Sequence, residues 1–284
     1  MNSEARTALL FGLAFAACAN CADLPQRIVS LSPDMTEMLY GVGAFSRVVG
    51  VSDYDTYPSE AAKLPRLGQL HTPSFEKLVG LRPDLVVINS VQAPLFEDEL
   101  HQLGLRVLKA SNWSVQEVYT AMLVIGRATG NESGAVRLVA STREGLDRVA
   151  HKTARLPKPR VVLIVNRTPG TLRDLSAATD ISYLGELVAI AGGRIVVPPS
   201  KTGYLSLGKE DLLAADPDII LDFIHEPQSR FAGDPLEPWR SMPELKAVRA
   251  NHVHGVNEDY VPHASQRIVQ TAELFQKLIH PEIR

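Results

Sequence analysis

Short apolar runs alternate along the first half of the chain with longer segments in which apolar residues recur at helical spacing. The short runs predict strands and the longer segments predict helices. Strands are predicted at residues 27–31, 48–51, 85–88 and 106–108, and helices at 33–40, 75–81, 95–103 and 115–128. This alternation is typical of βαβ units and predicts a mainly parallel sheet.

The longest amphipathic segment lies in the middle of the chain. Apolar residues recur among charged ones at Val136, Val139, Leu146 and Val149, and prolines follow shortly after residue 154. The pattern predicts one helix of roughly 20 residues and roughly 30 Å.

The second half returns to short alternating elements. Strands are predicted at 160–164, 195–197, 219–221 and 252–256, helices at 181–191, from 209 and at 265–279, and loops at 198–207 and 226–238. The order again indicates an α/β arrangement.

The second half also repeats a sequence motif of the first half. In residues 76–88 and again in residues 210–221, a glutamate precedes an apolar helical turn, Pro-Asp follows seven and eight residues later, and strand residues come next. The two glutamates lie 134 residues apart, and the first strands of the halves, opening at Arg27 and Arg160, lie 133 apart. Two units of similar plan are therefore expected.

These patterns predict an α/β protein of two similar lobes with mainly parallel sheets, joined by one long helix, with a ligand cleft between the lobes. We expect a signal peptide at residues 1–22, an N-terminal lobe at 23–130, a connecting helix at 131–156 and a C-terminal lobe at 157–284. Because a helix is a stiffer connection than a Gly/Ser linker, the lobes should rock only slightly.

The first residues differ from the rest of the chain. Residues 8–19 are almost wholly apolar, a run too short to cross a bilayer but suited to a secretory signal peptide. An amphipathic N-terminal helix is an alternative, although the run has no polar face. We expect a periplasmic protein without disulfides, because Cys18 and Cys21 both lie in this leader. Residues 15–18 also resemble a lipoprotein processing box, which would place a lipid anchor on Cys18.

Charge and composition exclude several partners. The 284 residues carry a formal net charge of −3 with acids and bases interspersed, so nucleic acid is not an expected partner. The sequence contains no Cys-rich metal box, glycine-rich phosphate loop or nucleophile elbow. We therefore expect no resident cofactor and no catalytic residue, and a monomer is the simplest assembly.

Several motifs, taken in their order and spacing, carry a resemblance to a known family. They are Ile28–Pro33 with Thr36 and Glu37, Gly50–Pro58, the two Glu-to-Pro-Asp segments, the long helix, Ala191–Gly193 and Ala264–Ile268. The chain resembles the helical-backbone substrate-binding proteins of ABC importers, which capture vitamin B12, haem and iron chelates. The resemblance covers almost all of the mature chain and implies a membrane permease as partner.

In that family each lobe presents one exposed glutamate to arginines of the permease. The matching positions are Glu76 and Glu210, and the resemblance implies that both dock on the permease. A purely structural role is the alternative, since an acid in the first turn of a helix is favoured by the macrodipole by about 0.3 to 1 kcal/mol.

Candidate ligand-binding residues come from the loops after the predicted strands, where ligands bind in open α/β sheets. They are Tyr54, Tyr57, Leu70, His71, Asn166, Arg167, Tyr204, Tyr260 and His263. Tyr204 and Leu70 each lie six residues before a docking glutamate and so are equivalent. Both equivalents are aromatic in the vitamin B12 binder, so Leu70 departs from that pattern. Each aromatic residue has plain packing as its alternative role.

The expected ligand is a metal chelate. Residues 54–58 and 260–268 look most like the vitamin B12 branch, which makes a corrinoid the first expectation and a ferric siderophore or haem the alternative. His71 is the candidate ligand to the metal of the chelate, because imidazole is a common metal ligand, although a solvated loop histidine is the simpler reading. An exported enzyme with His71 or His263 as general base is a remote alternative, since no paired acid, base and nucleophile is recognisable.

Overall fold

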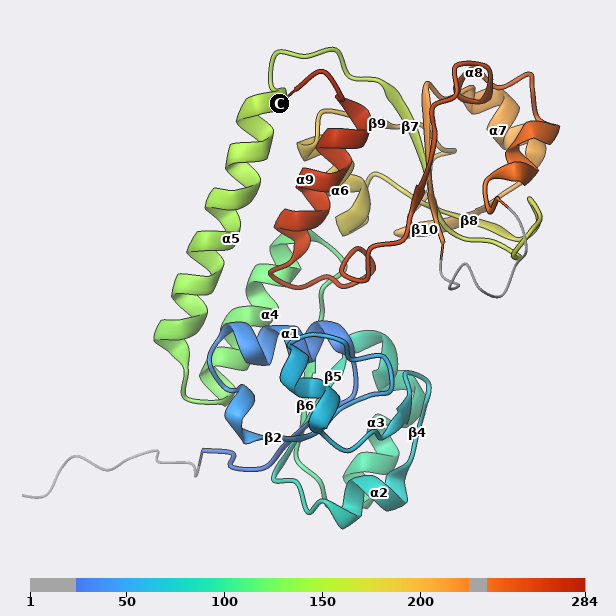
Figure 1. Cartoon of the computed structure of the whole chain (residues 1–284). Helices are drawn as coiled ribbons and strands as arrows, with labels where there is room; N and C mark the ends of the chain where they lie inside the picture. Colours follow the sequence, from blue (N-terminus) through green and yellow to red (C-terminus); the bar gives the residue numbers. More distant parts are fainter. Residues whose placement is uncertain (1–23, 225–233, 284) are drawn as a thin grey trace, which may run out of the picture.

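The computed structural model describes residues 24–224 and 234–283, which form two α/β lobes beside one long helix (Figure 1). The predicted signal peptide, with Cys18 and Cys21, lies outside the described residues, and so does most of the predicted loop at 226–238. Across the described ranges, no helix combines the length and apolar character needed to cross a bilayer. The predicted fold class, two α/β lobes with mainly parallel sheets, is confirmed.

The first lobe contains a parallel sheet of four strands in the order β2-β1-β5-β6. Its strands are β1 (Ile28–Ser30), β2 (Val48–Gly50), β5 (Leu85–Asn89) and β6 (Val107–Ala110). Its helices are α1 (Pro33–Gly41), α2 (Phe75–Gly80), α3 (Ala93–Gln102) and α4 (Val115–Ala128). A short antiparallel pair, β3 (Gly68–Gln69) with β4 (Thr72–Pro73), precedes α2. Single helical turns cover Phe45–Arg47, Ser59–Lys63 and Ser90–Gln92. The strand and helix predictions for this half hold to within a few residues.

The second lobe contains a sheet in the order β10-β8-β7-β11-β12, with β9 also paired to β7. Its strands are β7 (Arg160–Asn166), β8 (Leu175–Ala178), β9 (Arg194–Ile195), β10 (Tyr204–Leu207), β11 (Ile219–Phe223) and β12 (Val253–Val256). Its helices are α6 (Tyr183–Ile190), α7 (Lys209–Ala215), α8 (Lys246–Arg249) and α9 (Ile268–Ile279), with a helical turn at Glu237–Ser241.

One prediction for this lobe was wrong, and one strand was missed. Residues 204–207, expected in a loop, form β10, and β8 was not predicted at all. The two strands pair antiparallel with each other at the edge of the sheet. Each strand has only four residues, too few to show a clear alternation of apolar and polar positions, so the pairing itself stabilises them.

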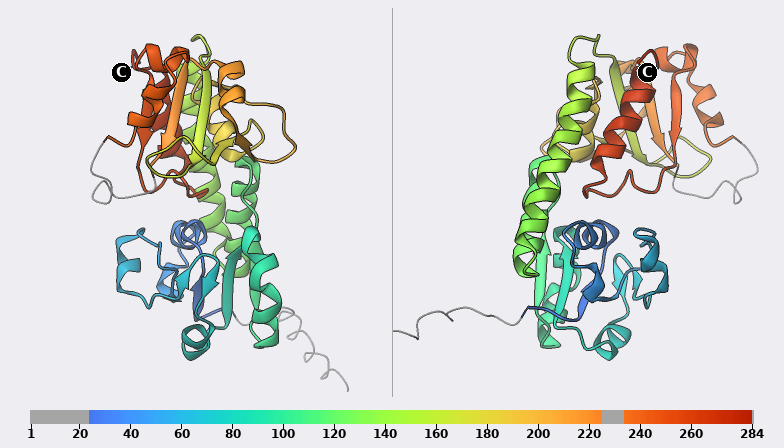
Figure 2. Two further views of the ribbon diagram at one scale, coloured as in Figure 1. Left: turned by 90° about the vertical axis from the view of Figure 1, so that its right-hand side faces the viewer. Right: turned by 60° about the vertical axis from the view of Figure 1, so that its left-hand side comes forward.

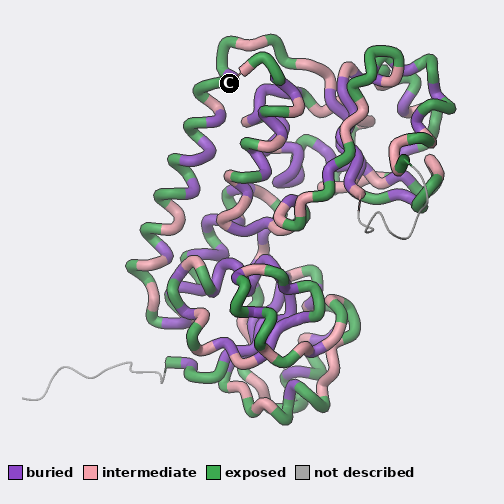
Figure 3. The backbone as a smooth tube through the Cα atoms, viewed as in Figure 1, coloured by how far each residue is buried: buried purple, intermediate pink, exposed green. Residues whose placement is uncertain are grey.

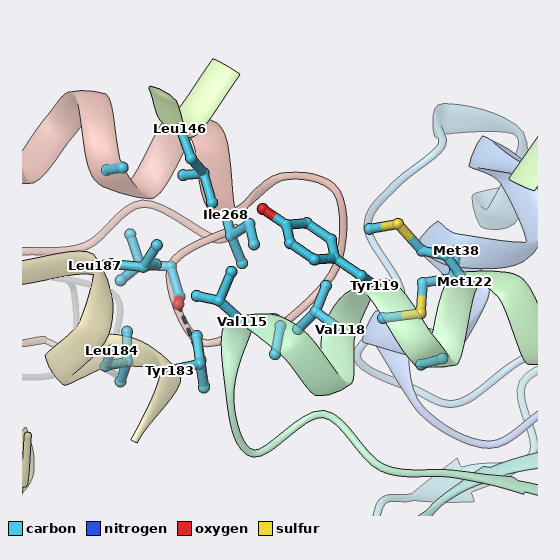
Figure 4. Packing of buried hydrophobic residues seen from close by; sticks show 14 of the residues in the cluster. Met38, Val115, Val118, Tyr119, Met122, Leu146, Tyr183, Leu184, Leu187 and Ile268 are labelled. Carbon is cyan, nitrogen blue, oxygen red and sulfur yellow. Dashed lines mark hydrogen bonds between the residues drawn. The ribbon is translucent and has the colours of Figure 1, made fainter. Parts of the chain in front are cut away.

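The long helix α5 (Glu132–Thr153) runs alongside both lobes (Figures 1 and 2). Buried and exposed positions alternate along α5, and among the described residues buried positions also run through the interior of both lobes (Figure 3). Figure 4 shows side chains of α4 lying between Met38 of α1 and Leu187 of α6. One hydrophobic core therefore continues from the first lobe into the second, which favours small movements between the lobes.

The repeated Glu-to-Pro-Asp motif corresponds to a repeated set of hydrogen bonds. The guanidinium of Arg27 donates to the carbonyl of Leu81 at 2.7 Å, and that of Arg160 donates to the carbonyl of Ala215 at 2.5 Å. In each lobe the aspartate of the Pro-Asp pair accepts from the backbone NH of the same arginine, at 2.9 and 2.8 Å. The Pro-Asp repeat therefore fixes the start of the first strand of each lobe.

Candidate ligand pocket between the lobes

A pocket of about 530 Å³ opens between the two lobes, a size typical of small-molecule sites. The first lobe contributes residues that follow strands β1, β5 and β6, where the carboxyl ends of parallel strands meet. The second lobe contributes Tyr183 of α6, Tyr204 of β10 and residues 262–264 after β12. The predicted cleft between the lobes is confirmed as a pocket.

The floor of the pocket is polar and comes wholly from the first lobe. One carboxylate oxygen of Asp34, Oδ2, accepts from the side-chain amides of Asn89 and Asn112, both at 2.5 Å. The Asn89 amide also donates to Oδ1 of Asn112 at 2.8 Å. We call Asp34, Asn89, Asn112 and the neighbouring Ser32 the polar floor.

The walls of the pocket are largely aromatic. Trp113 and Tyr204 face each other from opposite lobes, with ring centroids 6.1 Å apart. Tyr54 leaves 52% of its surface exposed, so its ring is available to a ligand. Burial raises the pKa of Tyr204 to about 12, and its hydroxyl therefore stays protonated at physiological pH. Such walls offer broad apolar faces with polar tips.

Beside the pocket, a buried glutamate joins the lobes. Glu37 of α1 is fully buried and accepts from three side chains of the second lobe: Nδ1 of His263 at 2.9 Å, Arg267 at 3.0 Å, and the hydroxyl of Ser265. Burial disfavours the charged form of His263, but the hydrogen bond and charge of Glu37 outweigh it and raise the pKa of His263 above its ordinary value. His263 thus links the pocket wall to the contact between the lobes.

The same contact extends outward through Arg267. Its guanidinium lies between two rings, 4.6 Å from the centroid of Tyr57 and 5.0 Å from that of Tyr260. It also pairs with Asp259 at 3.1 Å, and Asp259 accepts from Thr56 of the first lobe at 2.8 Å. Tyr57 and Tyr260, predicted to line the cleft, therefore lie in the contact between the lobes and outside the pocket lining.

The other predicted site residues divide into two groups. Five of them line the pocket together, and these are Tyr54, Leu70, His71, Tyr204 and His263. Asn166 and Arg167, at and just after the end of β7, do not line it. Arg167 is instead paired with the buried Asp222 at 2.9 Å, because a carboxylate without water requires a compensating charge.

The other pocket residues were not among the predicted site residues, and they include Ser32, Asp34, Asn89, Asn112 and Trp113. Asn89 directly follows the predicted strand 85–88, and Asn112 comes four residues after the predicted strand 106–108. Polar residues that follow two neighbouring parallel strands were therefore a usable signal. Among the described residues, no group of three or more His, Cys, Asp or Glu side chains could hold a metal ion.

The fold and the pocket define a bilobal binding protein. A family model described as periplasmic binding protein matches residues 28–260, and the chain belongs to that family. The predicted class, a substrate-binding protein of ABC transporters and not an enzyme, is confirmed. Members of the family are periplasmic or otherwise extracytoplasmic.

Named relatives give the same class. The chain is 28% identical over 265 residues to the uncharacterized ABC transporter substrate-binding lipoprotein YvrC of Bacillus subtilis, covering 91% of this chain and 81% of the relative. It is 24% identical to a vitamin B12-binding protein of Vibrio cholerae, with 87% of each chain covered. The crystal structure of a periplasmic haem-binding protein from Pseudomonas aeruginosa is similar with a TM-score of 0.79 at 22% identity, covering 92% of this chain and 95% of that one.

Proposed function

We propose that this protein captures a corrinoid in the periplasm and delivers it to the permease of an ABC importer. The observation that carries the proposal is the combination of aromatic walls, from Tyr54, Trp113 and Tyr204, with a polar floor free of basic residues. Flat aromatic faces suit an amphipathic macrocycle. Similarity to a vitamin B12-binding protein of Vibrio cholerae supports the same ligand class.

The charge of the pocket favours a corrinoid over an anionic chelate. Among the described residues that line the pocket, none is Lys or Arg, and Asp34 contributes a carboxylate. The peripheral groups of cobalamin are mostly neutral amides, whereas haem carries two propionates and catecholate siderophores are strongly anionic. A buried anion needs a compensating cation, which this lining lacks apart from its histidines.

Haem or a ferric siderophore is the second candidate. Tyr54 and His71 are both exposed to the pocket and are residue types that ligate iron. Similarity to a haem-binding structure from Pseudomonas aeruginosa favours the same class. In this case we propose His71 as the side chain that completes the coordination of the chelated metal.

Delivery is proposed to use Glu76 and Glu210. Both are exposed, both lie in the first turn of a helix, α2 and α7 respectively, and both helices lie on the side of the molecule away from α5 (Figure 1). Within the described part of the chain neither side chain has a hydrogen bond or ion pair. Charges at the edge of an interface fix register and orientation more than they add affinity.

Export precedes capture in this proposal. We propose cleavage of the leader near residue 22, with a monomer of lobes 23–130 and 157–284 joined by residues 131–156. Lipidation of Cys18 is the alternative form of the mature N-terminus.

Absorption spectroscopy and calorimetry test the ligand. The protein purified from its native host should carry corrin absorption bands, and titration with cyanocobalamin should give saturable one-to-one binding with the ligand recovered unaltered. A Soret band, or binding of a ferric siderophore but not of cyanocobalamin, would favour the second candidate. Chemical alteration of the recovered ligand would contradict a pure capture role.

A further inference from the structure

Three atoms of the polar floor keep capacity for further hydrogen bonds: the acceptors Oδ1 of Asp34 and Oδ1 of Asn112, and the hydroxyl of Ser32. Both hydrogens of the Asn89 amide are used, since this amide donates to Asp34 and to Asn112. Both hydrogens of the Asn112 amide are used too, since it donates to Asp34 and, at 3.0 Å, to the carbonyl of Ala264 in the second lobe. The two amides are therefore fixed in orientation and have no donor left for a ligand.

Asp34 keeps one acceptor position. An ionised carboxylate accepts about four hydrogen bonds. Oδ2 of Asp34 accepts two, from Asn89 and Asn112, and Oδ1 accepts one, from the backbone NH of Met35 at 3.0 Å. One acceptor position on Oδ1 therefore remains. Asp34 is 8% exposed and lines the pocket, so this position is available to a ligand.

Ser32 supplies the free donor of the polar floor. Its hydroxyl oxygen is buried without any hydrogen-bond partner among the described residues, and the residue, only 1% exposed, lines the pocket. Ser32 is the N-cap of the nine-residue helix α1 but does not cap it with its side chain. A buried hydroxyl is rarely left unpaired, so this one indicates a ligand group that can accept its hydrogen.

The charge at this place is also unusual. The donors that surround the Asp34 carboxylate are two side-chain amides and one backbone NH, all neutral. The nearby His263 is hydrogen-bonded to Glu37 and does not bond Asp34. A carboxylate held by neutral donors accepts a ligand NH and repels a ligand carboxylate.

We infer that the polar floor is a subsite for a primary carboxamide of the ligand, whose NH2 donates to Asp34 and whose C=O accepts from Ser32, and that it rejects a carboxylate in the same place. The inference rests on the proposed corrinoid ligand, because corrinoids carry several such carboxamides. It makes Asp34 and Ser32 specificity-determining residues. It also links ligand selection to the contact between the lobes, since Asn112 holds both Asp34 and the carbonyl of Ala264.

The test compares cyanocobalamin with its separated monocarboxylic acids, in each of which one propionamide is hydrolysed to a carboxylate. Calorimetry on the wild-type protein should show at least one acid that binds tenfold or more weakly than cyanocobalamin. In Asp34→Asn this discrimination should fall below threefold, because asparagine can donate to a carboxylate. Asp98→Asn, which removes an exposed charge on α3, is the matched control and should keep the wild-type discrimination.

A second variant guards against misfolding of Asp34→Asn. Ser32→Ala removes only an unpaired hydroxyl, so it should leave the thermal midpoint unchanged and weaken cyanocobalamin binding by roughly threefold to tenfold. Unchanged affinity in Ser32→Ala, or acids that all bind within threefold of cyanocobalamin to the wild type, would overturn the subsite.

Failure of the corrinoid proposal is distinguishable from failure of the subsite. If cyanocobalamin does not bind, the same comparison uses haem and haem with both propionates converted to amides. If the wild type prefers the diamide and Asp34→Asn loses this preference, the subsite is supported and the proposal of a corrinoid ligand is refuted. Preference for haem itself would overturn the subsite, and if neither pair binds both proposals are refuted.

Discussion

The two lobes share a plan but give the pocket different chemistry. In the first lobe, polar residues at or shortly after the ends of the parallel strands β1, β5 and β6 form the polar floor. In the second lobe the antiparallel pair β8 and β10 extends the sheet and brings Tyr204 to the pocket as an aromatic wall. A duplicated architecture therefore does not imply duplicated ligand contacts, because the added edge strands change which side chains reach the ligand.

The lobes also treat a buried carboxylate differently. Asp222 in the second lobe is compensated by Arg167 at 2.9 Å and accepts from the indole of Trp239 at 2.8 Å. Asp55 in the first lobe, 1% exposed, accepts from the hydroxyl of Ser52 at 2.5 Å, while the nearby Arg66 donates to backbone carbonyls. Burial, only partly offset by these neighbours, raises the pKa of Asp55 to about 6.

The largest expected effect concerns the feature that both lobes share, the exposed glutamates of α2 and α7. Glu76→Ala combined with Glu210→Ala should reduce ligand uptake by cells to background, while ligand affinity of the purified protein stays unchanged. Radiolabelled uptake and calorimetry measure the two quantities. Glu132→Ala, an exposed first-turn acid of α5, is the control and should leave uptake normal. Wild-type uptake in the double variant would remove the docking proposal.

The second prediction breaks the charge compensation in the second lobe. Arg167→Met should lower the free energy of unfolding by about 4 kcal/mol, because it leaves the Asp222 carboxylate buried without its cation. Urea denaturation measures the change. Arg173→Met, at an exposed position of the same loop, should change stability by less than about 0.5 kcal/mol. If Arg167→Met loses ligand binding but keeps wild-type stability, Arg167 acts in ligand binding and the structural role is contradicted.

The third prediction concerns Asp55, the buried carboxyl group of the first lobe whose charged form is only partly compensated. The folded state keeps the proton of Asp55 up to a pKa of about 6, whereas the unfolded chain loses it near 3.8. The native state therefore binds more protons between these values, and this group lowers stability as pH rises from about 4 to about 6. The loss amounts to about 3 kcal/mol at 1.36 kcal/mol per pKa unit.

Asp55→Asn cannot ionise, so the difference in unfolding free energy between variant and wild type should grow over that pH range and then level off. Urea titrations at a series of pH values measure it. A difference that does not change with pH would show that the burial of Asp55 does not control its ionisation.

The smallest effects are expected at Leu70 and Tyr204, the two equivalent positions that lie six residues before the docking glutamates. Tyr204→Ala should weaken corrinoid binding about tenfold through loss of one aromatic wall, and Leu70→Trp should strengthen it severalfold by adding one. Calorimetry with cyanocobalamin measures both. Tyr204→Phe keeps the ring and should bind as the wild type does. Equal losses in Tyr204→Phe and Tyr204→Ala would assign the effect to the hydroxyl.

The sequence by itself determined most of the fold. Strands such as β5 and β11 and helices such as α4 and α5 were predicted from local periodicity. The spacing of apolar residues within such a segment already indicates its type and which of its residues face the core. The repeat also predicted the two lobes, because the Pro-Asp aspartates act within their own lobe on the first strand. The edge strands β8 and β10 escaped prediction because neither has a strong pattern without its partner.

The pocket, in contrast, was decided by the tertiary structure. The hydrogen bond from Asn112 to the carbonyl of Ala264 joins residues 152 positions apart, and no local pattern indicates such a pair. Arg167 was assigned to the cleft because its partner Asp222 lies 55 positions away and is not recognisable from sequence. Periodicity shows which face of each element is apolar. Which polar groups become hydrogen-bond partners in the pocket depends on how the two lobes pack together.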